Sequence, residues 1–257
     1  MTAVLESPPA PVAPSHAQRT VRQEPAALPD RSWLDVAVPQ EAINLEGFLD
    51  WCASDEFPAG IKASLINGVL RIEPSMDDLF PQNALKTAII RALGNFGEQT
   101  KTGRTFSGGA MYAHMGDGRG NEPDVIFLRF DSLRAGRCSL EQRQPGANSA
   151  SVIYGAADLV VECVSPSSET KDTRDLRDAY FSAGVSEYWI LDGRGENLIF
   201  HLLTREQTAE DWKDAAVGEQ GVPTSPVLGQ QVAIERIFDP AGYPDWSVTL
   251  STAEPTE

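Results

Sequence analysis

The stretch that most constrains the fold runs from Ala157 to Asp192 and reads ADLVVECVSPSSETKDTRDLRDAYFSAGVSEYWILD. Its first part, ADLVVECV, is almost continuously apolar, as is typical of a strand buried on both faces. SPSSETKD has the composition of a turn and a helix cap. The apolar residues of DTRDLRDAYFSAG recur at helical spacing until Gly184, and SEYWILD is again apolar. The stretch therefore predicts a buried strand, a polar turn, a helix and a second buried strand.

The segments on either side predict further helices and strands. Helical spacing is present in INLEGFLDWCAS and NALKTAIIRALGNFGEQ. ASLINGVLRIEP has the pattern of a hairpin that turns at Asn67-Gly68. We expect a strand pair around RTFSGGAMYAHM, a Gly-rich loop at GDGRGNE, a strand at PDVIFLRF and an irregular stretch over 131–156. ENLIFHLL should follow SEYWILD as a hairpin that turns through Gly193-Arg194-Gly195.

The two ends of the chain show little periodicity. Residues 1–30 are rich in Pro, Ala and polar residues, so we predict a disordered N-terminal arm. After Thr204 the sequence mixes acids, Gly and Pro with short apolar patches such as VAIERIF. This pattern predicts one or two closing strands and fraying after Leu250.

Charge and cysteine usage narrow the classes of function. The chain has 21 Lys and Arg against 37 Asp and Glu, a net charge of −16. Such a charge repels a polyanion and argues against a non-specific DNA binder, but it leaves open a nuclease whose acidic site is bridged to phosphate by metal ions. Three widely spaced cysteines fit a reducing cytoplasm. No secretory signal is visible, and no apolar run reaches the roughly 20 residues that span a bilayer, so we expect no membrane association.

Several common site motifs are missing from the sequence. The stretch GDGRG is not followed by Lys and Ser or Thr, nor by a helix, so a turn is a better interpretation than a phosphate-binding loop. His16, His114 and His201 each stand alone, without metal-ligand spacing to a Cys or another His. No GxSxG motif supports a serine hydrolase.

Two acids lie in or beside predicted strands. Glu162 falls in the middle of ADLVVECV and, because side chains alternate, shares a face with Asp158 and Val160. A glutamate there is unfavourable unless it is paired, protonated or bound to a cation. A salt bridge to an arginine of the following helix, or an exposed strand end, would also account for it. Asp124 follows Pro123 at a strand start, which also suits a turn or capping residue.

Together, Asp124 and Glu162 suit a divalent cation with oxygen ligands, Mg²⁺ or Mn²⁺. Such a cation activates water and neutralises a phosphate during in-line hydrolysis. A nearby lysine would position the nucleophile or stabilise the developing negative charge. We therefore predict these two acids as metal ligands.

The segments EPDVIF, ADLVVECVSPSSE and DAYFSAGVSEYWILD together resemble the Uma2 family of restriction endonuclease-like proteins, which has the PD-(D/E)xK nuclease-like fold. The resemblance spans Ile43 to Leu203 and is most specific in VVE-x-x-SPSS and Y-x-x-AGV-x-EYW-x-x-D. Upstream, LINGVL resembles the family's first hairpin and NALKTAIIRAL the helix after it. The resemblance implies an α/β fold, with a restriction-endonuclease-like mixed β-sheet flanked by helices in a single domain.

The resemblance also implies site residues. The family's metal-binding Asp matches Asp124, and its Glu matches Glu162. The family usually carries its lysine on the following helix, four residues before Tyr180, where this chain has Leu176 on the apolar stripe. Among the nearest basic residues, Lys171 at the helix start has the reach to turn back toward Glu162. We predict Lys171 as the third catalytic residue.

Two further positions depart from the family pattern. Ser64 stands where the family's first hairpin has a glutamate, and Gln82 lies near the place of a histidine that often precedes the first long helix. The two predicted metal ligands are thus kept while residues that support them have changed.

Two functions of different classes follow. The first is a Mg²⁺-dependent endonuclease that hydrolyses DNA phosphodiester bonds, with its domain at 40–205 and a C-terminal extension at 206–257. The second is a catalytically impaired relative that serves as a binding or regulatory module, suggested by the changed lysine and the net charge of −16. DNA is a possible partner under the first function. Many nucleases of this fold cut duplexes as dimers, so a homodimer is compatible with the resemblance.

Overall fold

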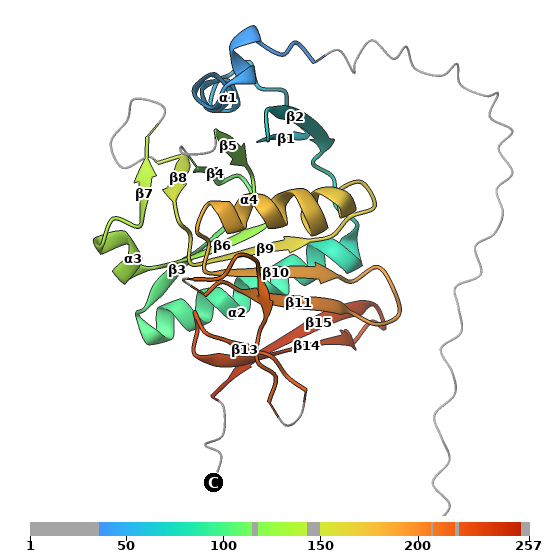
Figure 1. The fold of residues 1–257 in the computed structure, drawn as a ribbon. Helices are drawn as coiled ribbons and strands as arrows, with labels where there is room; N and C mark the ends of the chain where they lie inside the picture. The colour runs from blue at the N-terminus through green and yellow to red at the C-terminus, as the bar shows by residue number, and fades with distance from the viewer. Residues whose placement is uncertain (1–35, 115–117, 143–149, 207, 219–220, 253–257) are drawn as a thin grey trace, which may run out of the picture. The chain divides into compact units, whose positions relative to one another are not determined.

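The computed structural model describes residues 36–114, 118–142, 150–206, 208–218 and 221–252 (Figure 1). The described residues from Val38 onward form one compact unit. The arm predicted for residues 1–30 lies outside the described residues. Within the part that is described, no helix combines the length and the apolar character needed to cross a membrane.

A mixed six-stranded sheet forms the centre of this unit. Its strands, in spatial order, are β12 (Lys213–Asp214), β11 (Ile199–Thr204), β10 (Glu187–Asp192), β9 (Leu159–Cys163), β6 (Val125–Arg129) and β3 (Gly103–Ser107). Strands β9 and β10 are parallel, and the other neighbours in this sheet are antiparallel. The parallel pair arises because a helical crossover separates β9 from β10, as the sequence predicted for the stretch from Ala157 to Asp192.

Helices cover both faces of this sheet (Figure 1). Helix α2 (Leu85–Thr100) packs its apolar side against Leu159 and Val161 of β9. On the opposite face lies α4 (Leu176–Ser182), which continues from the π-helical turn η5 (Lys171–Asp175) and packs against Val160. The alternation predicted for β9 is therefore confirmed, and it turns Glu162 toward α4.

A second six-stranded sheet contains the predicted hairpin. Its strands, in spatial order, are β2 (Val69–Pro74), β1 (Ile61–Ile66), β5 (Arg119–Asn121), β4 (Met111–His114), β8 (Val152–Gly155) and β7 (Cys138–Glu141). The hairpin turns at Asn67 and Gly68, whose φ angles of 54° and 74° are those of a turn that follows the twist of the strands. The short helices of the unit are η2 (Gln40–Ile43), α1 (Leu45–Cys52), η3 (Leu79–Ala84) and α3 (Phe130–Arg134).

Three predictions about the middle of the chain need correction. RTFSGGAMYAHM forms strands β3 and β4, but they lie in different sheets and do not pair with each other. The predicted loop GDGRGNE contains strand β5. Gly120 in β5 lies so close to α1 that an added Cβ would come within 3.0 Å of the Phe48 ring, so here glycine permits packing. The stretch 131–156, predicted as irregular, contributes α3, β7 and β8.

The C-terminal part forms a third sheet, of strands β13 (Thr224–Ser225), β14 (Gln230–Phe238) and β15 (Pro244–Ser251). It adds more strands than the one or two that were predicted. Val232 and Trp246 are buried in the same apolar cluster as Leu85 and Ile89 of α2. The C-terminal strands therefore cover the side of α2 that faces away from the central sheet.

Candidate functional site

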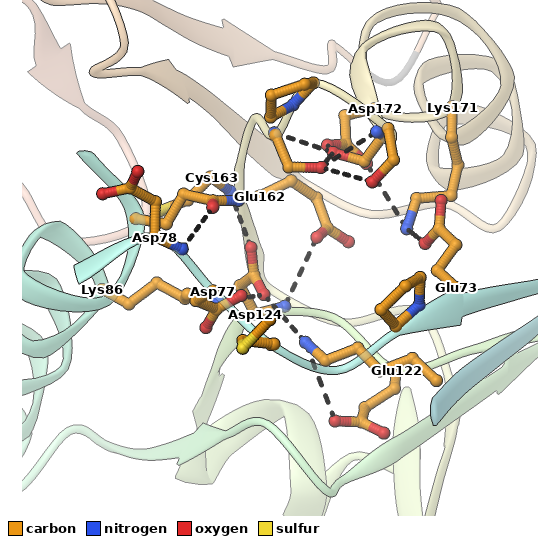
Figure 2. A pocket seen from close by; sticks show the side chains of 18 residues that line it. Glu73, Asp77, Asp78, Lys86, Glu122, Asp124, Glu162, Cys163, Lys171 and Asp172 are labelled. Atoms are coloured by element: carbon orange, nitrogen blue, oxygen red, sulfur yellow. Dashed lines mark hydrogen bonds and ion pairs between the residues drawn. The ribbon is translucent and has the colours of Figure 1, made fainter. Parts of the chain in front are cut away.

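A cleft of about 480 Å³ opens where the hairpin β1–β2, the start of α2, the end of β9 and the turn η5 meet (Figure 2). Acidic side chains outnumber basic ones around it. The ionisable residues that line it are Glu73, Asp77, Asp78, Glu122, Asp124, Glu162 and Asp172 with Lys62, Lys86 and Lys171. The sequence-predicted Asp124, Glu162 and Lys171 all belong to this one cleft.

Asp124 and Glu162 come from neighbouring antiparallel strands. Val125 is opposite Val161 in the register of β6 and β9, so Asp124 lies beside Glu162. The backbone N–H of Asp124 donates to Glu162 Oε2 at 3.4 Å, and the backbone N–H of Cys163 donates to Asp124 Oδ2 at 2.8 Å. Both acids are buried, with residue exposures of 7% and 3%. They face the same space, as Figure 2 shows.

The side-chain hydrogen-bond donor to Glu162 is a tyrosine of α4. The Tyr180 hydroxyl donates to Glu162 Oε1 at 2.6 Å and accepts from Asn121 Nδ2 at 2.6 Å. Burial, together with the neighbouring Asp124 and Asp172, raises the pKa of Glu162 well above its ordinary value. Because Glu162 is buried within β9, the alternative of an exposed strand end is wrong.

Two lysines that the sequence analysis did not select meet at Asp124. Lys62 Nζ on β1 lies 3.3 Å from Asp124 Oδ1, and Lys86 Nζ near the start of α2 lies 3.1 Å from the same oxygen. Burial lowers the pKa of each lysine, but Asp124 opposes it and the net pKa of both is raised. The sequence held one signal for this: Lys86 falls on the apolar stripe of its helix, with Ile89 and Leu93.

Lys171 lies on the wall formed by η5. Its ammonium donates to Glu73 Oε2 at 2.6 Å and lies 3.7 Å from Asp172 Oδ1. Burial lowers the pKa of Lys171, yet Glu162, Asp172 and Glu73 together raise it above its ordinary value. Lys171 thus points into the cleft, where its ion pairs are with Glu73 and Asp172.

The positions that depart from the family pattern are buried. Leu176 is 1% exposed in the apolar cluster with Tyr180, which confirms the prediction that it is a core residue. Ser64 is buried, and its hydroxyl has no hydrogen-bond partner among the described residues. The side chain of Gln82 accepts from the backbone N–H of Asp78 at 2.9 Å. It therefore shapes the loop that carries Asp77 and Asp78.

Asp172 is a further buried acid that sequence reasoning missed. One of its oxygens accepts from the Ser168 hydroxyl, while Oδ1 is buried without a hydrogen-bond partner in the described part of the chain. Burial raises the pKa of Asp172 to about 7, against the opposing effects of Lys171 and Ser168. The turn SPSS, expected only to cap a helix, is what holds this acid.

The donor set fits a divalent cation of the Mg²⁺ or Mn²⁺ type. Asp124 and Glu162 offer adjacent carboxylate oxygens, and Asp172, whose Oδ1 is ion-paired with Lys171 at 3.7 Å, lines the same cleft. Across the described residues, no three or more His, Cys, Asp and Glu side chains are grouped as metal ligands. A cation held by one or two carboxylates keeps several waters, as Mg²⁺ commonly does.

The fold is of the α/β class, with a mixed sheet flanked by helices. A crystal structure described as a putative nuclease belonging to DUF820 from Anabaena variabilis ATCC 29413 has a similar fold, with a TM-score of 0.50 and 16% sequence identity. The match covers 72% of this chain and 90% of that one. No curated protein matches the chain.

The chain belongs to the Uma2 family. The family model, described as "Putative restriction endonuclease", matches residues 45–235. The matched range begins at α1 and ends within β14, so it includes every residue that lines the cleft.

Proposed function

We propose that this protein is an endonuclease that hydrolyses DNA phosphodiester bonds with Mg²⁺ or Mn²⁺ as its cofactor. The observation that carries the proposal is the convergence of Asp124 and Glu162, from adjacent strands, in one cleft lined by lysines. The family description and the nuclease title of the similar crystal structure support it. Hydrolysis adds water across one P–O ester bond and yields a phosphomonoester and an alcohol, so it needs no other co-reactant.

The residues of the cleft have separate roles in this proposal. Asp124 and Glu162 hold the cation, and Tyr180 orients Glu162 through its 2.6 Å hydrogen bond. When bound, the cation supplies an activated water and neutralises phosphate charge. Lys171 provides positive charge on the wall of η5, where Glu73 positions its ammonium. The free thiols of Cys52, Cys138 and Cys163 suit the cytoplasmic location that we include in the proposal.

A cleavage assay tests the proposal. Double- and single-stranded DNA should be cut with Mg²⁺ or Mn²⁺ and left intact with a chelator. The double variant Asp124→Asn, Glu162→Gln keeps the shape of both side chains, and it should lose at least about 100-fold in rate, because its amides bind cations poorly. Asp178→Asn, an exposed acid on α4, is the matched control. A wild-type chain that cuts neither substrate, or a double variant that cuts as fast, would refute the proposal.

Leu176 favours a second candidate function, a catalytically impaired relative that acts as a binding or regulatory module. This residue stands in the core at the position where the family carries its lysine. Calorimetry separates the two candidates. The second predicts no heat of Mg²⁺ or Mn²⁺ binding and unchanged stability of the double variant, whereas the first predicts a cation-binding heat that the double variant loses. Sedimentation with and without a DNA duplex tests whether the chain acts as a homodimer.

A further inference from the structure

Lys86 is a buried cation on the apolar side of a helix. Its neighbours Leu85, Ile89 and Leu93 on α2 are fully buried, and Lys86 itself is only 9% exposed. Lysine is rarely buried unless it is paired, because removing an ammonium from water is unfavourable. A leucine or methionine would pack better on this helix face, so the contacts of the ammonium group must account for a lysine here.

The amine of Lys86 meets two carboxylates in the cleft. It lies 3.1 Å from Asp124 Oδ1 and forms a short ion pair with Asp77 Oδ2. Lys62 reaches the same oxygen of Asp124, at 3.3 Å, but its side chain is 22% exposed, against 11% for Lys86. Lys86 is thus the more enclosed of the two cations on the acid that we propose as a metal ligand.

The other candidate positions for a catalytic lysine are less suited. Leu176, at the family position, packs in the apolar core with Tyr180 and does not line the cleft. Lys171 is ion-paired with Glu73 at 2.6 Å and with Asp172 at 3.7 Å, and neither of these acids is a proposed metal ligand. Figure 2 shows Lys171 with these two acids on one side of the cleft, and Lys86 with Asp77 on the other side of Asp124.

We propose that Lys86 takes the part of the lysine that the family carries at the position of Leu176. Without a divalent cation, its ammonium neutralises Asp124 Oδ1 and so competes for the cation site. With a cation on Asp124, the ammonium would stay paired with Asp77 and would stabilise the negative charge that develops on the phosphate. The competition rests on the proposed cation site at Asp124, and the catalytic part rests in addition on the proposed endonuclease activity.

Calorimetry with Mg²⁺ and with Mn²⁺ tests the competition without any cleavage. Lys86→Met removes the ammonium and keeps an unbranched side chain, so the variant should bind either cation at least about fivefold more tightly. Lys86→Arg keeps the charge and should bind like the wild type, and Lys171→Met should change affinity less than Lys86→Met. Thermal melting confirms that each variant is folded. Unchanged or weaker binding by folded Lys86→Met would overturn the assignment.

Cleavage kinetics test the catalytic part. At saturating cation, Lys86→Met should lower kcat about 100-fold with little change in KM, and Lys86→Arg should restore part of the loss. The loss in Lys171→Met should be at least about tenfold smaller, and Arg174→Met, an exposed cation on η5, is the control. A larger loss in Lys171→Met than in Lys86→Met refutes the catalytic assignment. If the wild type cuts no DNA, the proposed function fails, and the calorimetry still decides whether Lys86 competes with the cation.

Discussion

Tyr180 decides how Glu162 is presented to the cleft. A fully buried carboxylate would take up a proton, and burial raises the pKa of Glu162 in that direction. The Tyr180 hydroxyl opposes this by donating to Oε1, while Asn121 donates to the tyrosine oxygen and fixes the direction of its proton. The hydrogen bond from Tyr180 therefore orients Glu162 and reduces the rise in its pKa, which still stays well above its ordinary value.

This arrangement makes a prediction for Tyr180→Phe. Without the phenolic hydrogen bond, the pKa of Glu162 rises further and its ionised form is less populated. Mn²⁺ affinity at neutral pH should fall about tenfold, and it should recover in part as the pH is raised. Calorimetric titration at several pH values measures this. Tyr188→Phe is the matched control, because Tyr188 donates to the backbone oxygen of Asp172. Equal losses in both variants would contradict the role given to Tyr180.

Among the single residues of the candidate site, the sequence predicted the two acids but not the lysines that pair with Asp124. Asp124 and Glu162 were found because an acid beside or within an apolar strand breaks a local pattern. Lys86 and Lys62 reach Asp124 across 38 and 62 residues of sequence. A contact of that kind depends on how a helix and a hairpin dock on the sheet, which local periodicity does not encode. Lys171 lines the cleft but pairs with Glu73 and Asp172, and its catalytic role stays a prediction.

Among the elements, β10 has a buried acid that joins it to the C-terminal sheet. Glu187 is fully buried and accepts hydrogen bonds from Trp189 Nε1, from the Ser225 hydroxyl at 2.9 Å and from the Val227 backbone N–H at 3.0 Å. These contacts tie the start of β10 to the segment around β13. Burial raises the pKa of Glu187 to about 7 from an ordinary value of 4.5, although its hydrogen bonds oppose the shift.

The pKa of Glu187 predicts how stability depends on pH. Between about pH 4.5 and about pH 7 the folded chain binds the proton more tightly than the unfolded chain does. The free energy of unfolding should therefore fall as pH rises through this range, by about 3 kcal/mol at most from this group. Glu187→Gln does not titrate, so its stability should fall less between pH 5 and pH 8 in urea unfolding without metal ions. Glu235→Gln, an exposed acid on β14, should keep the wild-type slope, and a shared slope for all three chains would refute the prediction.

Elements with local order were predictable, and elements whose partners are distant were not. The β9–α4–β10 unit and the hairpin at Asn67-Gly68 were correct because their pairing follows from adjacent sequence. Strands β3 and β4 are also adjacent in sequence, yet β3 pairs with β6, and β4 with β5 and β8. The sequence of a short strand with one buried face says little about which strand it pairs with. The separation of β3 and β4 into two sheets could therefore not be predicted from their local sequence.

For the whole molecule, the C-terminal strands are part of the structure that supports the cleft. Trp246 of β15 is 1% exposed, and its indole N–H donates to the Phe80 backbone oxygen at 2.7 Å. Phe80 lies in η3, which leads directly into α2 and thus to Lys86. The short apolar patches of the tail did not reveal this, because each strand buries only one face against a distant helix.

The net charge of −16 predicts how cleavage of DNA depends on salt. A nuclease that approaches DNA through lysines and arginines releases counterions, and its affinity falls steeply as salt rises. Here acids outnumber lysines in the cleft as well as in the whole chain, so the long-range field repels a polyanion. Salt should weaken this repulsion because the screening length shortens to about 8 Å at physiological ionic strength.

We therefore expect kcat/KM for DNA, at a fixed concentration of free Mg²⁺, to stay level or rise up to about threefold between about 50 and about 200 mM KCl. A small phosphodiester with a single charge is the control, because long-range repulsion affects it little and its kcat/KM should hardly change. If kcat/KM for DNA instead falls about 100-fold or more over this range, basic contacts dominate the encounter. The cleft would then not be the surface that DNA meets first, because its lysines are already paired with Asp124, Asp77 and Glu73.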